Sequence, residues 1–317
     1  MSEPRRWSIV RRPSSEHMHR HIIHNHRLIE ATKARLPALT SATLYGRGVF
    51  TTLAVYRGRP FLWPQHWARL AAHAAKVGVS LRGMTEENVR DSLSRVLAAN
   101  EVEEGRARIT LLAREAGNIW KGTSRKRAAV ETDLLIMTGD ARRVPEEGVA
   151  LTLSPHRINS LSPLAGVKSL NYLDHLLAWE EARGREFDEA VRLNERGELV
   201  SATMANLFWL TQGMLYTPTL ATGALAGTTR AGVIALAGEL SVPHVEGVFE
   251  LSHLAEADEI FLTSAGLGVA PVTAFDYHRY IAAAGSVALR LREAFRQLTF
   301  GEALKLTTED MENTEGS

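Results

Sequence analysis

Strand-length and helix-length apolar patterns alternate between the two polar ends of this chain, and this alternation constrains its fold more than any other feature. Apolar runs around Ile109–Leu112 and Leu134–Met137 have the length of buried strands. Elsewhere apolar residues recur at helical spacing, as between Val89 and Leu97, where Thr85 can cap the helix. The sequence therefore predicts a mixed α/β fold.

The length of 317 residues is about twice that of an ordinary domain. Around residues 140–165 the sequence becomes richer in Arg, Glu, Pro and Ser, as expected of a domain junction. We therefore expect a smaller N-terminal α/β domain over residues 21–145 and a larger C-terminal domain over residues 155–305. Residues 1–20 are expected to form a loosely held extension, and residues 306–317 a polar tail.

The composition excludes several kinds of chemistry. Because the chain has no cysteine, it cannot form disulfides, thiolate zinc sites, iron–sulfur clusters or cysteine nucleophiles. Its 37 basic and 36 acidic residues give a net charge of +1, which provides no field to attract nucleic acid or an anionic membrane. We find no run of 18 apolar residues and no secretory signal, so we expect a soluble, cytoplasmic protein.

Lys168 is the one lysine of six that lies in an apolar stretch, LAGVKSLNYL. Burial in an apolar pocket destabilises an ammonium group, so the pKa of such a lysine falls and its neutral amine becomes a usable nucleophile. The alternative interpretation is a surface lysine whose ammonium extends into solvent. We single out Lys168 as the candidate nucleophile.

Two further features are suited to binding an anion. The segment Ala226–Arg230, AGTTR, opens a helix, and its glycine and two hydroxyl residues leave amide and hydroxyl donors for a ligand. Arg69 lies in a second helical segment, which begins near Pro64, and a guanidinium group there can hold a phosphate. An ordinary capped helix and a solvated surface charge are the alternative interpretations.

Taken in order, these segments resemble the class IV family of pyridoxal-phosphate enzymes, which contains branched-chain aminotransferases, D-amino-acid aminotransferases and 4-amino-4-deoxychorismate lyase. The resemblance extends from about Tyr45 to Val272. It rests on the segments YGRGVFTT, HWARL, RITLLAREAG, KSLNYL, DEAVRLNERGELVSATMANLFWL, LYTP, GALAGTTR and FLTSAGLGVAPV. The resemblance implies a two-domain fold of the D-amino-acid aminotransferase type, with pyridoxal 5'-phosphate (PLP) at the domain interface, and a homodimer.

The resemblance also implies roles for individual residues. Lys168 would form a Schiff base with PLP and move the proton of the substrate. The other residues expected to bind the cofactor are Arg69, Tyr172, Ser201, Met204, Ala205, Asn206, Thr228 and Thr229. The residues expected to bind the substrate are Tyr45, Arg47, Phe50, Thr51, Arg108, Ser264 and Ala265. For Arg47 and Arg108, an ion pair within the protein is the alternative to a substrate carboxylate.

Two departures from the family pattern bear on the reaction. Ser201 occupies the place of a glutamate that faces the pyridine nitrogen, and a serine hydroxyl cannot stabilise a protonated nitrogen as a carboxylate does. We therefore expect a weaker electron sink. Phe50-Thr51-Thr52 replaces the Phe-Glu-Thr of most aminotransferases and resembles the lyase, which makes Thr51 or Thr52 a candidate near the reacting centre; a plain strand threonine is the alternative.

The function favoured by this resemblance is an aminotransferase that exchanges an amino group between a small amino acid or amine and a 2-oxo acid. A lyase that resembles 4-amino-4-deoxychorismate lyase and releases pyruvate is the first alternative. A protein that binds PLP but has lost efficient turnover is the second.

Five histidines crowd one N-terminal segment, yet we predict no metal site there. They are His17, His19, His21, His24 and His26.

Overall fold

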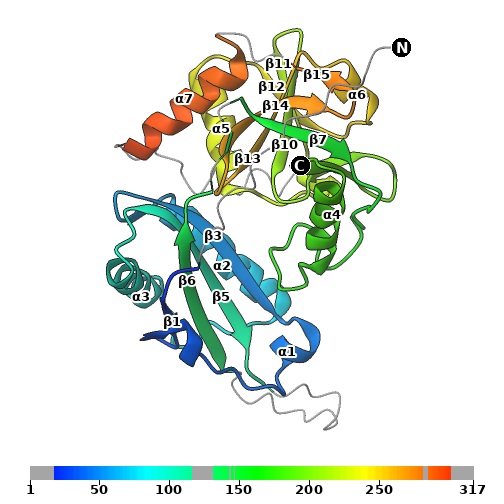
Figure 1. Ribbon diagram of the computed structural model, residues 1–317. Helices are drawn as coiled ribbons and strands as arrows, with labels where there is room; N and C mark the ends of the chain where they lie inside the picture. Colours follow the sequence, from blue (N-terminus) through cyan, green and yellow to red (C-terminus); the bar gives the residue numbers. More distant parts are fainter. Residues whose placement is uncertain (1–17, 116–130, 143, 146, 281–284, 301–317) are drawn as a thin grey trace, which may run out of the picture.

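The computed structural model describes residues 18–115, 131–142, 144–145, 147–280 and 285–300. Within these residues the strands form two sheets, one of six strands and one of nine, and Figure 1 shows them as two separate layers joined by the chain after strand β6. The mixed α/β fold predicted from the sequence is confirmed. In this part of the chain, no helix is both long and apolar enough to cross a membrane.

The first sheet is antiparallel throughout and has the strand order β2-β1-β6-β5-β3-β4. Its strands are β1 (His21–His24), β2 (Arg27–Glu30), β3 (Gly48–Tyr56), β4 (Arg59–Pro60), β5 (Glu104–Ala113) and β6 (Thr132–Asp140). The helices of this half are η1 (Ala31–Lys33), α1 (Ser41–Tyr45), α2 (Trp63–Val77) and α3 (Glu86–Ala99).

Helices α2 and α3 form where the sequence predicts them. Pro64 lies in the first turn of α2, where its missing N–H leaves no hydrogen bond unmade. Thr85 caps α3, because its side chain accepts a hydrogen bond from the backbone N–H of Asn88. The apolar face of α3, from Val89 to Leu97, is buried in the core of the first sheet.

The second sheet has the order β12-β11-β10-β13-β14-β7-β8-β9, and β15 pairs with β14. Its strands are β7 (Val149–Leu153), β8 (Glu189–Leu193), β9 (Leu199–Ala202), β10 (Asn206–Thr211), β11 (Met214–Pro218), β12 (His244–Gly247), β13 (Glu259–Ser264), β14 (Gly268–Phe275) and β15 (His278–Arg279). The helices are α4 (Leu173–Gly184), η3 (Leu220–Thr222), α5 (Thr228–Glu239), α6 (Ser252–Ala255) and α7 (Val287–Phe300).

The second sheet is buried on both faces. Successive side chains of a strand point to opposite faces, so Leu207 and Trp209 of β10 belong to one core while Phe208 and Leu210 belong to the other, which α5 and α7 cover. This double burial explains why the sequence LFWL of β10 is a continuous apolar run. The last strand of the first sheet, β6, ends at Asp140, and β7 of the second sheet begins at Val149. We keep two domains over residues 21–145 and 155–305 as a proposal, although β7 lies before the second range.

The segment that carries Lys168 follows β7 of the second sheet and forms hydrogen bonds with β3 of the first. The backbone N–H of Phe50 in β3 donates to the carbonyl of Lys168 at 3.0 Å, and the N–H of Leu170 donates to the carbonyl of Gly48 at 3.0 Å. A Cβ at Gly48 would lie 2.5 Å from the Leu170 side chain and 2.6 Å from the Leu111 carbonyl. The close approach therefore requires glycine, and it places Lys168 against the first sheet.

Candidate active site

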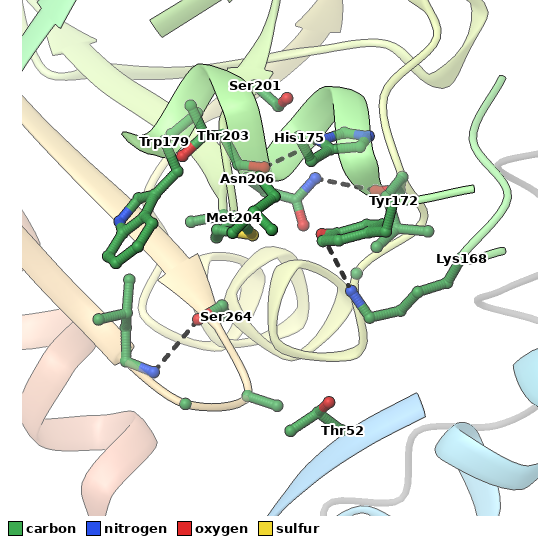
Figure 2. A pocket seen from close by; sticks show the side chains of 18 of the residues that line it. Thr52, Lys168, Tyr172, His175, Trp179, Ser201, Thr203, Met204, Asn206 and Ser264 are labelled. Carbon is green, nitrogen blue, oxygen red and sulfur yellow. Dashed lines mark hydrogen bonds between the residues drawn. The ribbon is translucent and has the colours of Figure 1, made fainter. Parts of the chain in front are cut away.

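A cavity of about 1160 Å³ is lined by residues of both sheets and by the segment that carries Lys168. Figure 2 shows Lys168 and Tyr172 on one side of it, the turn from Ser201 to Asn206 above, and Thr52 of β3 opposite. The structure brings most of the predicted site residues together here. Those that line the cavity are Phe50, Arg69, Arg108, Lys168, Tyr172, Ser201, Met204, Ala205, Asn206, Thr228, Thr229, Ser264 and Ala265.

Lys168 is a low-pKa amine. Burial, and then the charges of Arg69 and Arg108, lower the pKa of Lys168 to about 7, because each of them disfavours the charged ammonium form of the side chain. Its Nζ lies 4.7 Å from the centre of the Phe50 ring, and no salt bridge of Lys168 occurs among the described residues. A large fraction of this amine is therefore neutral near pH 7, as a nucleophile requires.

Tyr172 and His73 hold Lys168 in place. The phenolic oxygen of Tyr172 lies 3.4 Å from Nζ, and burial followed by the charge of Glu189 raises the pKa of Tyr172 to about 12, so the phenol stays protonated. The backbone N–H of Lys168 donates to Nδ1 of His73 at 3.1 Å. Burial lowers the pKa of His73 to about 4, so the imidazole is neutral and can accept this hydrogen bond.

Around Arg69 and the start of α5, the site has unpartnered hydrogen-bond donors, which suit an anion. Arg69 donates from one terminal nitrogen to the carbonyl of Ala226 and from the other to the hydroxyl of Thr51, each at 3.0 Å. Its Nε is buried and has no hydrogen-bond partner among the described residues. Thr228 and Thr229 form the first turn of α5, where the backbone N–H groups have no partner within the helix.

Asn206 fixes the chain just before α5. Its side-chain amide donates to the carbonyl of Leu225 at 2.8 Å. A Cβ at Gly227 would lie only 2.0 Å from the side-chain oxygen of Asn206, so the residue that precedes the helix must be glycine. The glycine of the Gly-Thr-Thr sequence is therefore required by close packing.

A buried carboxylate, that of Glu189, fixes the turn between β9 and β10 by hydrogen bonds. Glu189 of β8 accepts hydrogen bonds from the Thr203 hydroxyl and, at 3.2 Å, from the Met204 N–H. Burial raises the pKa of Glu189. Ser201 precedes this turn and pairs with Arg192 of β8. Arg192, like Glu189, is fully buried.

The two threonines of β3 point in opposite directions. Thr52 lines the cavity, whereas Thr51 is buried behind its wall and lies 2.7 Å from Nδ1 of His66. Alternation along a strand allows only one of the pair to face a substrate. Of the two candidates left by the sequence, the structure thus brings Thr52 and not Thr51 to the cavity, and a contact of Thr52 with the substrate stays a prediction.

The structure does not bring Tyr45 and Arg47 to this cavity. Tyr45 ends the short helix α1 and is 42% exposed. Arg47 pairs with Glu115 at 2.6 Å, which is the ion pair that the sequence left as the alternative. Arg108, in contrast, has its guanidinium carbon 3.6 Å from the centre of the Phe50 ring and makes no ion pair within the described residues.

Three histidines of the N-terminal segment make ordinary hydrogen bonds, whereas the buried Nε2 of His24 has no partner among the described residues. His19 bonds to Thr138, His21 to Asn100 and His26 to Ser92. His17 lies outside the described residues. No group of three or more possible metal ligands occurs in the part of the chain that the structure describes.

Sequence reasoning missed the roles of His66 and His73. Both lie with Arg69 on one face of α2, at i, i+3 and i+7, where the apolar periodicity predicts core residues instead. Polar residues at this spacing on a buried face were the signal that could have revealed them. Arg192 is a similar case, because it interrupts the apolar run of β8.

Comparison with known proteins points to one family. A model of the amino-transferase class IV family matches residues 48–275. A putative branched-chain-amino-acid aminotransferase of Methanocaldococcus jannaschii is 30% identical over 290 residues, which are 90% of this chain and 98% of that protein. An aminodeoxychorismate lyase of Bacillus subtilis is 28% identical over 281 residues, which are 86% of this chain and 92% of that protein.

The same likeness is found among solved structures. The crystal structure of a branched-chain aminotransferase from the thermophilic archaeon Thermoproteus uzoniensis, with norvaline, has a TM-score of 0.80 at 25% identity. The match covers 90% of this chain and 97% of that chain. The relatives thus share the fold and include both aminotransferases and lyases.

Proposed function

We propose, on the premise that this chain belongs to the class IV aminotransferase family, that it transfers an amino group between a small amino acid or amine and a 2-oxo acid. The family resemblance found in the sequence is confirmed, and the chain is a PLP-dependent enzyme. The observation that carries the proposal is the low-pKa amine of Lys168 in the same cavity as the anion-binding turn of α5.

The residues present fit PLP. The unpartnered Nε of Arg69 and the first turn of α5 offer unused donors, which suit the phosphate of the cofactor. The neutral amine of Lys168 suits its aldehyde. The protonated phenol of Tyr172, 3.4 Å from that amine, suits its phenolic oxygen.

When bound, PLP supplies a conjugated ring that stabilises negative charge at the substrate Cα. Arg69, Thr228 and Thr229 would hold its phosphate, and the protonated phenol of Tyr172 would donate a hydrogen bond to the cofactor. The neutral Nζ of Lys168 would be the base that accepts the proton of the substrate Cα and holds it as an ammonium. Arg108, stacked on Phe50, supplies a charge for the carboxylate of the substrate.

A lyase of the aminodeoxychorismate type is the second candidate. Two observations favour it: Thr52 faces the cavity, and the residue at position 201 is a serine instead of a carboxylate. A hydroxyl stabilises a protonated ring nitrogen less than a carboxylate does, because a charge-assisted hydrogen bond is about twice as strong as a neutral one. A reaction with a good leaving group tolerates this loss better than transamination does.

A half-reaction screen separates these functions. The purified, PLP-loaded protein is mixed with a panel of L- and D-amino acids, and its absorption spectrum is followed. We expect conversion of the bound cofactor to its amine form with at least one amino acid, and the reverse change on addition of a 2-oxo acid. Release of pyruvate from aminodeoxychorismate without that conversion would instead support the lyase. If neither occurs, the chain is a PLP-binding protein with degenerate catalysis.

We also propose that the protein is a homodimer. Leu173 and Leu177 of α4 and Leu44 of α1 are exposed apolar residues. The two helices lie close together, because the side chain of Asn171 donates to the carbonyl of Gly46 at 3.1 Å. Sedimentation equilibrium should give twice the mass of the chain, and Leu173→Asp should shift the equilibrium to monomer. A monomeric unaltered protein would contradict the proposal.

A further inference from the structure

Four buried polar side chains form a continuous hydrogen-bonded chain behind the anion-binding turn. Arg69 of α2 donates to the hydroxyl of Thr51 of β3 at 3.0 Å. The same hydroxyl lies 2.7 Å from Nδ1 of His66, and Nε2 of His66 lies 3.1 Å from the hydroxyl of Thr228 in α5. All four residues are at most 6% exposed. The chain therefore links one group of the anion site, Arg69, to another, Thr228, through His66.

His66 is neutral in this environment. Burial, and then the charges of Arg69 and Lys168, hold the pKa of His66 well below its usual value. A neutral imidazole carries one N–H donor and one acceptor nitrogen. The hydrogen bonds on its two sides must consequently run in the same direction along the chain.

Arg69 sets that direction. A guanidinium group can only donate, so the Thr51 oxygen accepts from it. Among the described residues, the only other partner of the Thr51 hydroxyl is Nδ1 of His66, to which its hydrogen must therefore go. In the opposite direction that hydrogen would be buried without an acceptor, which proteins rarely tolerate. Nδ1 thus accepts, and Nε2 carries the hydrogen that is donated to Thr228.

We propose that His66 is a positioning residue that aims the hydroxyl hydrogen of Thr228 into the cavity. Because Nε2–H donates to the Thr228 oxygen, the hydrogen of Thr228 remains available for the phosphate of PLP at the first turn of α5. The opposite tautomer would use that hydrogen on the imidazole and turn an oxygen lone pair toward the anion. The inference rests on the function proposed above.

Two substitutions at position 66 test the direction of the chain. The amide of His66→Gln reaches the place of Nε2 and can still donate to Thr228, whereas the amide of His66→Asn reaches only the place of Nδ1. We expect His66→Asn to weaken PLP binding by about tenfold or more, and His66→Gln by no more than about threefold. The dissociation constants are measured by fluorescence quenching for PLP and for pyridoxal, which has no phosphate.

Pyridoxal is the matched control. We expect both variants to bind it within about threefold of the unaltered protein, because the proposed donor contacts only the phosphate. Unchanged PLP affinity in His66→Asn would overturn the proposal. An equal loss for PLP and pyridoxal would also overturn it, since it would indicate a general structural defect.

The tautomer itself can be read directly. In protein labelled with ¹⁵N-histidine, the ring signals of His66 are assigned by their loss in His66→Gln. The proposal expects the hydrogen on Nε2, both without and with PLP. A hydrogen on Nδ1 would overturn it. Failure of the unaltered protein to bind PLP would refute the proposed function instead, while the ring signals of the apoprotein would still decide the role of His66.

Discussion

Replacing Lys168 with alanine should lower kcat by about a thousandfold or more, because the variant loses both the amine that bonds to the cofactor and the base that moves the Cα proton. The rate is measured with the best amino donor and acceptor found in the half-reaction screen. The matched control is Lys33→Ala, which removes an exposed lysine paired with Glu30 at 3.4 Å, and it should leave kcat unchanged. If Lys168→Ala retained most of the activity, the assignment of the catalytic residue would be wrong.

The same amine should destabilise the protein when no cofactor is bound. Its pKa falls from 10.5 in the unfolded chain to about 7 in the folded protein, which corresponds to at most about 5 kcal/mol. Because the amine lines a cavity that water can enter, we expect the real cost to be smaller, roughly 2–3 kcal/mol. Lys168→Met, whose unbranched side chain is one atom shorter and carries no charge, should raise the free energy of unfolding of the apoprotein by about that amount below pH 7.

The gain from Lys168→Met should depend on pH in a defined way. Between about pH 7 and pH 10.5 the unfolded chain binds more protons at Lys168 than the folded protein does, so the stability of the unaltered apoprotein rises over this window. The advantage of the variant is therefore complete below pH 7 and disappears toward pH 10.5. Urea unfolding at pH 6.5 and pH 9.5 measures the difference, and a gain that is equal at both values would contradict it.

Residues with a strong local signal could be predicted from the sequence. Thr85 marks the start of α3 because capping depends on a few neighbouring residues. Lys168 stands out by its apolar neighbours, and the Gly-Thr-Thr that opens α5 stands out because helix starts have a local chemistry. All of these signals lie within a short stretch of chain.

Contacts between distant segments could not be predicted in this way. The pairing of Leu170 with Gly48 joins residues 122 positions apart, and it places Lys168 against the first sheet. Whether Thr51 or Thr52 faces the cavity depends on the register of β3 against β5, because a shift of one residue would turn each side chain to the other face of the sheet. The ion pair of Arg47 with Glu115 likewise depends on tertiary structure.

Polar residues on buried faces were the other gap. His66 and His73 occupy helix positions that periodicity assigns to the core, and nothing in the local sequence says that each will meet a partner from another element. Their partners, Thr51 and the backbone of Lys168, come from β3 and from the segment after β7. Only the assembled fold shows that one face of α2 holds both parts of the site.

The attachment point of the cofactor tests the account most directly. The PLP-loaded protein is treated with sodium borohydride, digested and mapped by peptide mass. The account predicts the mass of the reduced cofactor on the peptide that contains Lys168, and its loss in Lys168→Ala. The modification of another lysine in the unaltered protein, with Lys168 left free, would contradict it.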